Sequence, residues 1–266
     1  MNDSVLLPVL LKDTPRDMVW GILQTEGRYA GMRIGEVWFD AGPLLIKFIT
    51  TADKLSVQVH PGDDYASRHE AHRGGRGKTE IWHVMAAAPG ARLAIGFTGT
   101  GVSREQVHRA ALEGTLEQEL CWLDAHAGQT IFVPAGTVHA MGAGLTICEI
   151  QQHCDITYRM YDYGRLDRGR PRELHLERAL DVMAADRGLA PGAGMVELPF
   201  HGEYFQVEPL TAESGSTREV AAGHWVVLDG QGTIGGQPYE PRQVWRISEP
   251  SEWRSACATQ TLLVNT

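Results

Sequence analysis

A histidine that follows a rigid turn is the first residue in this sequence that could do chemistry. Residues 128–141 read GQTIFVPAGTVHAM. The apolar residues 131–133 favour a half-buried strand, while Pro134 and Gly136 predict a tight turn after it. His139 therefore begins the next strand directly after a fixed corner. In that position it is a candidate metal ligand or acid–base group.

Two further polar side chains lie on a predicted strand much earlier in the chain. In LSVQVH, residues 55–60, apolar and polar side chains alternate. Gln58 and His60 therefore point to the same side, with their backbones about 6–7 Å apart, and the apolar side chains point to the other side. Such a strand suits a site inside a β-barrel, although ordinary polar packing explains the same pattern.

Composition narrows the class of protein. The chain has 266 residues, 43% of them hydrophobic, which allows one large or two small domains. A net charge of −9 argues against nonspecific binding to nucleic acid. Four cysteines without CxxC spacing indicate reduced thiols, and no apolar stretch approaches the ~20 residues of a membrane span. We expect a cytoplasmic protein, monomer or homodimer, that binds neither nucleic acid nor membrane.

Local patterns place most candidate residues on or beside strands. The sequence DTPRD at 13–17 is typical of a helix start, with Asp13 or Thr14 as the N-cap and Pro15 in the first turn. A basic, glycine-rich stretch at 61–78 indicates a loop. Further helices are predicted at 103–120, where Ser103 and Gln106 have capping-box spacing, and at 173–186. Strands are predicted at 32–40, 44–50, 79–85, 92–97 and 145–151, and an extended segment at 155–162.

Short strands separated by Gly/Pro turns dominate the remainder, which indicates a sandwich or jelly roll. The sequence APGAG at 190–194 is the best candidate for a linker. Residues 165–172 are basic and are expected to form a surface loop. The C-terminal strands are predicted at 204–210, 225–228, 243–247 and 260–264.

The stretch at 128–141 resembles the second half-motif of the cupin superfamily, with Gly128, Pro134, Gly136 and His139 in the expected order. Four segments together, LSVQVHPGDDYA, GKTEIWHV, VPAGTVHAMGAG and EIQQHCDITYRMYDYGR, resemble type I mannose-6-phosphate isomerases in their small bacterial form. The resemblance runs over about residues 20–165. In the C-terminal third it is limited to the general character of the sequence. This chain lacks the longer segment that the family usually has between the strands at 32–40 and 44–50.

The resemblance implies an all-β protein with a few helices. Its architecture would be two cupin-type jelly-roll β-barrels packed together, with helical insertions in the N-terminal part. We assign residues 1–189 to a catalytic metal-binding cupin domain and residues 190–266 to a smaller, metal-free cupin-like β domain. The metal-free assignment rests on the histidines of residues 190–266. This part of the sequence contains only His201 and His224, and neither lies in a Gln-x-His or a PxGxxH motif.

The resemblance also implies a metal site. The family's zinc ligands fall on Gln58, His60, Glu80 and His139, which predicts one Zn²⁺ per chain. Mn, Fe or Co suits the same nitrogen and oxygen donors. With a single anionic ligand the metal keeps positive charge, which suits polarising a sugar carbonyl and stabilising an enediolate.

The activity implied is that of an aldose–ketose isomerase interconverting mannose 6-phosphate and fructose 6-phosphate through a cis-enediol. Lys54 and Lys78 match lysines that line the family's active site. Arg159 is expected to stabilise the enediolate or to grip the phosphate. Lys78 shares the strand face of Glu80, so we expect the metal to lower its pKa and to let it shuttle protons. Glu149 is either a base or the partner of Arg159.

Two other functions are open to a cupin. One is an Fe-dependent oxidoreductase, against which the glutamine ligand and the single carboxylate argue. The other is a non-catalytic sugar-binding cupin that has kept the fold after its pocket was trimmed.

Overall fold

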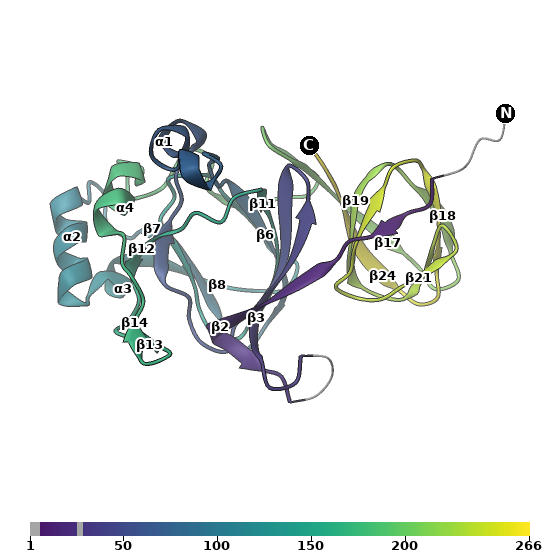
Figure 1. The fold of residues 1–266 in the computed structure, drawn as a ribbon, viewed down its shortest axis with the longest axis horizontal. Coiled ribbons are helices and arrows are strands. Elements are labelled where there is room, and N and C mark those ends of the chain that lie inside the picture. The colour runs from purple at the N-terminus through teal and green to yellow at the C-terminus, as the bar shows by residue number, and fades with distance from the viewer. Residues whose placement is uncertain (1–5, 26–28) are drawn as a thin grey trace. The chain divides into compact units, whose positions relative to one another are not determined.

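The computed structural model describes residues 6–25 and 29–266, which form a mainly β protein with four α-helices (Figure 1). Its residues divide into two compact units. The first combines the N-terminal segment up to Thr14 with Trp38–Ile46 and Glu197–Thr266. The second combines Pro15–Val37 and Lys47–Val196. The predicted division of function between residues 1–189 and 190–266 stays a prediction.

Two sheets contain most of the strands of the second unit, and residues 13–14, 38–41 and 44–46 of the larger sheet are grouped with the first unit. The five-stranded sheet has the order β12-β5-β10-β7-β8. Its strands are β5 (Val57–Val59), β7 (Arg92–Phe97), β8 (Leu120–Asp124), β10 (His139–Met141) and β12 (Tyr158–Tyr161). The seven-stranded sheet has the order β15-β9-β6-β11-β4-β3-β2. Its strands are β2 (Asp13–Leu23), β3 (Arg33–Ala41), β4 (Leu44–Thr50), β6 (Glu80–Ala87), β9 (Thr130–Val133), β11 (Leu145–Gln152) and β15 (Gly194–Val196).

The strands predicted at 44–50 and 92–97 are confirmed, but the helix predicted from Asp13 is wrong. That segment is β2, the last strand of the seven-stranded sheet. An edge position tolerates a proline because one side of the strand needs no N–H donor. The missing side chain of Gly35 leaves room for Met18 and Trp20, whose atoms lie 2.6 Å from the position a Cβ would take. Tertiary packing thus overrides the local capping signal.

The helices lie within the second unit, and Figure 1 shows three of them gathered on one side of it. They are α1 (Asp63–His69), α2 (Arg104–Glu113), α3 (Leu116–Glu119) and α4 (Leu176–Val182). The capping box of Ser103 and Gln106 is confirmed at the start of α2, which ends at Gly114 in a left-handed conformation. The predicted loop at 61–78 contains α1 and a 3₁₀ helix, Ala71–Arg73. No helix in the described part of the chain is long and apolar enough to cross a membrane.

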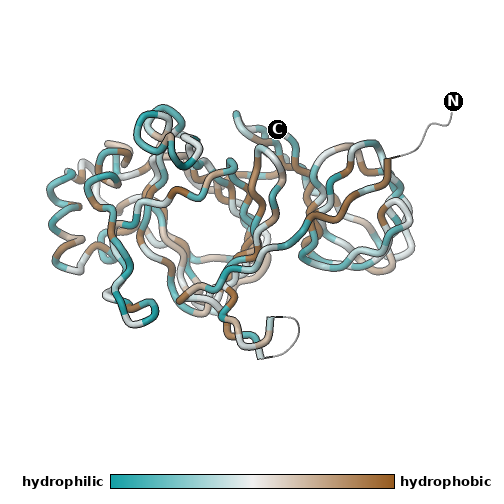
Figure 2. The backbone as a smooth tube through the Cα atoms, in the orientation of Figure 1, coloured by the Kyte–Doolittle hydropathy of each residue, from teal (hydrophilic) through white to brown (hydrophobic). Residues whose placement is uncertain are grey.

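The core of the second unit has two layers. Val57 and Val59 of β5 pack with Val107 of α2 and Leu180 of α4, so these helices cover the outer face of the five-stranded sheet. A second cluster, which includes Trp82, fills space between the two sheets. Figure 2 shows polar and apolar residues alternating along α2, as a helix covering a sheet requires. Because β5 turns Val57 and Val59 towards the helices, Gln58 faces the interior between the sheets.

The first unit is also built from two sheets, ordered β1-β22-β19-β24-β17-β16 and β18-β23-β20-β21. The strands of the first are β1 (Val9–Leu10), β16 (Phe200–His201), β17 (Gln206–Ala212), β19 (Gly223–Asp229), β22 (Val244–Ile247) and β24 (Thr259–Asn265). Those of the second are β18 (Thr217–Val220), β20 (Gly232–Ile234), β21 (Gln237–Tyr239) and β23 (Ser251–Ser255). Trp225, Tyr239 and Trp253 pack together in the core. β1 pairs with β22, placing Val9 opposite Arg246.

One short hairpin lies in the segment predicted as a basic surface loop. Its strands are β13 (Leu166–Asp167) and β14 (Arg170–Pro171), and both are exposed.

The prediction of an all-β protein with a few helices is confirmed. Paired sheets in each unit give the architecture expected of a cupin-type fold.

Candidate metal centre

Strand register brings three of the predicted site residues side by side. In the five-stranded sheet, Gln58 of β5 lies opposite His139 of β10 on one side and opposite Arg159 of β12 on the other. Directly opposed residues project from the same face of a sheet. Gln58 faces the interior, so His139 and Arg159 face it too. Glu80 approaches from the first position of β6 in the other sheet.

Both histidines are oriented by backbone carbonyls. Nδ1 of His60 lies 2.9 Å from the carbonyl oxygen of Ile156, and Nδ1 of His139 lies 2.9 Å from that of Thr137. A carbonyl only accepts, so each Nδ1 carries the proton and each Nε2 keeps its lone pair. This is the arrangement in which a histidine binds a metal through Nε2.

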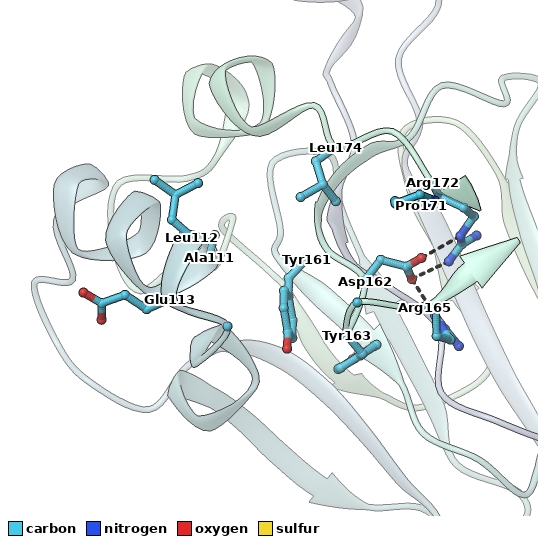
Figure 3. A pocket seen from close by; sticks show the side chains of 12 residues that line it. Ala111, Leu112, Glu113, Tyr161, Asp162, Tyr163, Arg165, Pro171, Arg172 and Leu174 are labelled. Carbon is cyan, nitrogen blue, oxygen red and sulfur yellow. Dashed lines mark hydrogen bonds and ion pairs between the residues drawn. The ribbon is translucent and has the colours of Figure 1, made fainter. Parts of the chain in front are cut away.

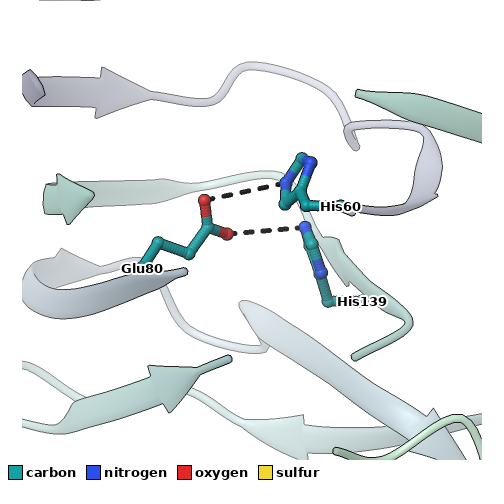
Figure 4. A group of neighbouring side chains, drawn as sticks. All are labelled: His60, Glu80 and His139. Atoms are coloured by element: carbon teal, nitrogen blue, oxygen red, sulfur yellow. Dashed lines mark ion pairs between the residues drawn. The ribbon is translucent and has the colours of Figure 1, made fainter. Parts of the chain in front are cut away.

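The carboxylate of Glu80 faces both free nitrogens. Its Oε2 lies 3.6 Å from His60 Nε2, and its Oε1 lies 3.5 Å from His139 Nε2 (Figure 4). Two metal–ligand bonds of about 2.1 Å at a tetrahedral angle separate the ligand atoms by about 3.4 Å. The ligand atoms of all three residues lie within 4.8 Å of one another. The spacing therefore fits a zinc-sized cation.

The donor chemistry fits as well. Glu80 is fully buried, and its Oε2 accepts no well-aligned hydrogen bond from any described residue, although the Lys78 ammonium lies 2.5 Å away as an ion pair. Gln58 places its amide nitrogen 3.1 Å from His139 Nε2 and its oxygen 3.3 Å from the Ser56 hydroxyl. Rotating this amide would present the oxygen as a fourth ligand. His60, Glu80 and His139 thus converge, and Gln58 as the fourth ligand implied by the resemblance stays a prediction.

A chain of alternating charges surrounds Glu80. Lys78 Nζ lies 2.9 Å from His60 Nε2 and 3.8 Å from Glu149, and Glu149 bonds to Lys47 Nζ at 2.9 Å. Trp82 Nε1 donates to both Glu80 and Glu149, at 3.1 Å each. Lys47 was not among the predicted site residues. Its signal was present in the sequence, because a lysine inside the apolar strand LLIKFIT must be buried and therefore needs an anionic partner.

Burial sets the protonation of the histidines. Burial, aided by the charge of Lys78, lowers the pKa of His60 and lowers that of His139 to about 4. Both rings are therefore neutral at neutral pH, as metal ligation requires. Burial and the neighbouring Glu149 raise the pKa of Glu80, against the opposing effect of Lys78.

The expectation that a bound metal lowers the pKa of Lys78 stays a prediction, and the protein's own groups act on this pKa in two directions. Burial alone would lower it, but the carboxylates of Glu149 and Glu80 outweigh burial and raise the pKa of Lys78. Burial alone would likewise raise the pKa of Glu149, but Lys47 and Lys78 hold it down at about 2. Both groups are charged at neutral pH. Glu149 was expected to be either a base or the partner of Arg159. Among the described residues its side chain contacts Lys47, Lys78 and Trp82, and these contacts do not include Arg159.

Arg159 is half-buried and keeps spare donors. Its Nη1 donates to the carbonyl of Glu173 at 2.7 Å, and its Nε is buried without a hydrogen-bond partner among the described residues. Burial and the nearby Arg172 lower the pKa of Arg159, which remains far above neutrality. A half-buried guanidinium with an unused N–H, on the same face as Gln58, is well placed to receive an anion.

Lys54 lies in a different environment from Lys78. Its ammonium bonds to both carboxylate oxygens of Glu117 at 2.7 Å and lies 4.1 Å from the centre of the Tyr163 ring. These contacts connect Lys54 to Glu117 and Tyr163, not to the residues around Glu80. The predicted catalytic role of Lys54 stays a prediction.

Tyr163 borders a cavity of about 380 Å³ between the C-terminal end of α2 and the segment after β12 (Figure 3). Asp162 lies in its wall, where it accepts hydrogen bonds from Arg165 at 2.6 Å and from Arg172 at 2.8 and 2.5 Å. These bonds hold Asp162 ionised, because the two guanidiniums lower its pKa against the effect of burial. The cluster braces the chain just beyond Arg159.

No protein-family model matches the chain. Over 142 residues it is 43% identical to mannose-6-phosphate isomerase from Streptococcus mutans, a match that covers 53% of this chain and 43% of that protein. The chain spans about half the length of the curated relatives that it matches.

The fold extends the similarity to nearly the whole chain. The crystal structure of mannose 6-phosphate isomerase from Bacillus subtilis superposes with a TM-score of 0.80 at 24% identity, covering 97% of this chain and 99% of that one. A zinc-bound mannose 6-phosphate isomerase superposes with a TM-score of 0.72 at 11% identity, covering 98% and 100%. Over the matched segment in sequence, and over almost its full length in fold, this chain resembles the mannose-6-phosphate isomerases.

Proposed function

We propose that the protein is a zinc-dependent aldose–ketose isomerase that interconverts mannose 6-phosphate and fructose 6-phosphate. The observation that carries the proposal is the buried set of His60, Glu80 and His139, whose free ligand atoms converge within 4.8 Å beside Lys78 and Arg159. Similarity to the mannose-6-phosphate isomerases supplies the substrate. The four cysteines are free thiols, which agrees with the cytoplasmic location that we propose.

Gln58, His60, Glu80 and His139 would hold one zinc ion. When bound, the ion supplies positive charge that polarises the sugar oxygens. Gln58 and Arg159 are half-buried while His60, Glu80 and His139 are buried, so solvent and substrate reach the centre from the side of Gln58 and Arg159. Arg159 would orient the substrate there and stabilise negative charge on the enediolate or the phosphate.

The charged network determines how protons can move. Ideal general bases have a pKa near the working pH. The pKa of Glu149 is about 2, which makes its carboxylate a weak base. We therefore assign Glu149 to holding Lys78 and Lys47 in place. Lys78 contacts both His60 and Glu80, and we propose that it orients the substrate oxygen that exchanges a proton during enediol formation.

A coupled assay on metal-free and zinc-reconstituted protein tests the proposal. We expect mannose 6-phosphate to be converted to fructose 6-phosphate only by the metal-loaded form. Conversion should be accompanied by exchange of substrate hydrogen with deuterated solvent, because a base removes a proton from carbon to form the cis-enediol and can exchange that proton with solvent before a proton is returned to the neighbouring carbon. Oxygen uptake with iron in place of zinc would indicate a cupin oxidoreductase. Binding of the sugar phosphate without turnover would indicate a non-catalytic sugar-binding cupin.

A further inference from the structure

Glu70 carries a buried carboxylate outside the candidate metal centre. It lies within residues 61–78, which we call the excursion because this segment leaves the five-stranded sheet after β5 and leads into β6 of the seven-stranded sheet just beyond Lys78. The backbone N–H of Lys78 donates to the carbonyl of Pro61 at 3.0 Å, which closes the base of the excursion. Predicted site residues therefore flank this segment at both ends, and Glu70 lies in its middle with only 1% of its surface exposed.

The side chain of Glu70 connects two elements that bear on the site. Its Oε1 accepts a hydrogen bond from the Tyr158 hydroxyl at 2.8 Å and another, with an ion pair, from Arg178 of α4. Tyr158 lies in β12 directly before Arg159 and opposite Val59 of β5. Glu70 thus joins the excursion to the strand that carries Arg159.

The backbone of Glu70 fixes its own position. Its N–H donates to Ala66 at 2.8 Å, and its carbonyl accepts from Arg73 at 2.8 Å and from Gly75 at 3.0 Å. The same residue therefore ends α1 and begins the 3₁₀ helix. A carboxylate fixed in this way loses little conformational freedom when it binds Tyr158, so the bond is stiff.

The base of the excursion does not need this carboxylate. Asp63 accepts from the Gly77 N–H at 2.7 Å and from the Gln152 side chain at 3.2 Å, and the Pro61–Lys78 bond lies beside these contacts. His60 is held separately through the carbonyl of Ile156. Removing the charge of Glu70 would therefore leave the base of the excursion closed, and leave Glu80 and His139 held by β9 and β7, while it would release chiefly β12 and α4.

We infer that Glu70 is a positioning residue that holds Tyr158, and through it Arg159, at a fixed distance from the metal centre. The inference rests on the proposed isomerase function for its kinetic consequence. Its structural consequence, the coupling of the excursion to β12, does not depend on that function. Small displacements of a group that orients a substrate reduce turnover strongly, by up to about 10²-fold for 1 Å.

The test compares Glu70→Gln and Tyr158→Phe with a control, Glu177→Gln. Glu177 is an exposed carboxylate on α4 that lies 3.3 Å from His108 and does not contact the excursion. Hydrogen–deuterium exchange of zinc-free and zinc-loaded protein should show faster exchange at 157–162 in the first two variants and no change in the control. In the coupled assay, kcat of the first two variants should fall about tenfold or more, while KM and zinc affinity stay within about twofold.

Arg159→Lys provides the decisive background, because it keeps the charge but changes the reach of the group. If Glu70 acts through Arg159, Glu70→Gln should cost little further activity in that background. An equal further loss, or a parallel loss of zinc, would show general destabilisation and overturn the inference. Unchanged exchange at 157–162 would overturn it whatever the activity. If the wild type isomerises no hexose phosphate while exchange responds as expected, the proposed function fails and the coupling of Glu70 to β12 stands.

Discussion

His139 and Arg159 flank Gln58 on neighbouring strands, yet their surroundings give them different tasks. His139 is buried, neutral and oriented by Thr137, which suits a ligand. Arg159 is half-buried, charged and incompletely hydrogen-bonded, which suits contact with an anion that comes and goes. The two residues therefore allow metal binding and turnover to be separated by mutation.

We expect His139→Ala to remove zinc and activity together, because a two-histidine site loses half of its nitrogen ligands. Metal analysis after dialysis, run beside the coupled assay, measures both. The control is His83→Ala on β6, where His83 lies three residues after Glu80, on the opposite face of that strand, and contacts the Thr130 hydroxyl at 3.0 Å. It should keep zinc and rate. A His139→Ala protein that retained one zinc per chain would remove His139 from the ligand set.

Arg159→Ala should keep its zinc and lose turnover, by about 10²–10³-fold in kcat, the cost of one donor to a developing charge. The same two measurements apply, and here the zinc content should stay at the wild-type level while the rate falls. A rate near that of the wild type would contradict the role assigned to Arg159.

The candidate metal ligands could be named from the sequence, whereas the charged network around them could be predicted only in part. Gln58, His60 and His139 occur in local patterns that can be recognised in the sequence without the structure. The bond of Lys47 to Glu149 joins β4 to β11, and which lysine meets which carboxylate depends on sheet register. Register is set by non-local pairing, so no local pattern in the sequence indicates that Lys47 meets Glu149.

At the scale of elements, the excursion at 61–78 matters because it returns the chain to the metal centre at Lys78. Its closure depends on close backbone contact at Gly77. A Cβ at Gly77 would lie 2.6 Å from the backbone nitrogen of Asp63, whereas a Cβ at Gly62 would meet nothing closer than Ala135 at 3.9 Å. These two glycines lie at opposite ends of the excursion, so an alanine substitution at Gly62 is a suitable control for one at Gly77.

Gly77→Ala should destabilise the fold by about 1–3 kcal/mol, the usual cost of overpacking against backbone, and should weaken zinc binding. Gly62→Ala should be close to neutral, because φ of −80° at Gly62 is accessible to alanine. Thermal unfolding and chelator competition measure the two effects. Equal behaviour of the two variants would show that closure of the excursion does not constrain the site.

The Asp162 cluster predicts a pH dependence of stability. Arg172 and Arg165 lower the pKa of Asp162 in the folded state below its unfolded value of about 3.9. Its stabilisation is therefore complete above that pH and is lost as the pH falls through the folded-state pKa. Asp162→Asn should cost about 2–3 kcal/mol at pH 7 and less near pH 3, which lies below the unfolded-state pKa. Urea unfolding at both pH values checks this, with Glu252→Gln on an exposed pair as control.

Elements with strong local signals were predicted well, and those decided by packing were not. The capping box at Ser103 and the apolar run of β4 specify their structure within a few residues. The cap-like residues around Asp13 carry an equally good local signal, but the edge of a sheet takes them as β2. Only the position of that edge, which is a tertiary property, decides between the two.

At the scale of the whole molecule, all four candidate ligands belong to the second unit. Zinc binding should therefore stabilise that unit by mass action, by about 4 kcal/mol at a free zinc concentration a thousandfold above Kd. Hydrogen exchange with zinc and with a chelator should show new protection at 57–84 and little change at 206–264. Equal protection of both ranges would show that the two units unfold as one.

The pairing of β1 with β22 means that the second unit is inserted within the sequence of the first. A ribosome delivers residues 15–196 before β17 to β24 exist. The candidate ligands, the last of which is His139, can be assembled and loaded while the first unit still lacks most of its strands. β1 stays unpaired until its partner β22 has been synthesised. Metal acquisition can thus precede completion of the protein, and the newly made chain would be most exposed to misassembly at its earliest strand.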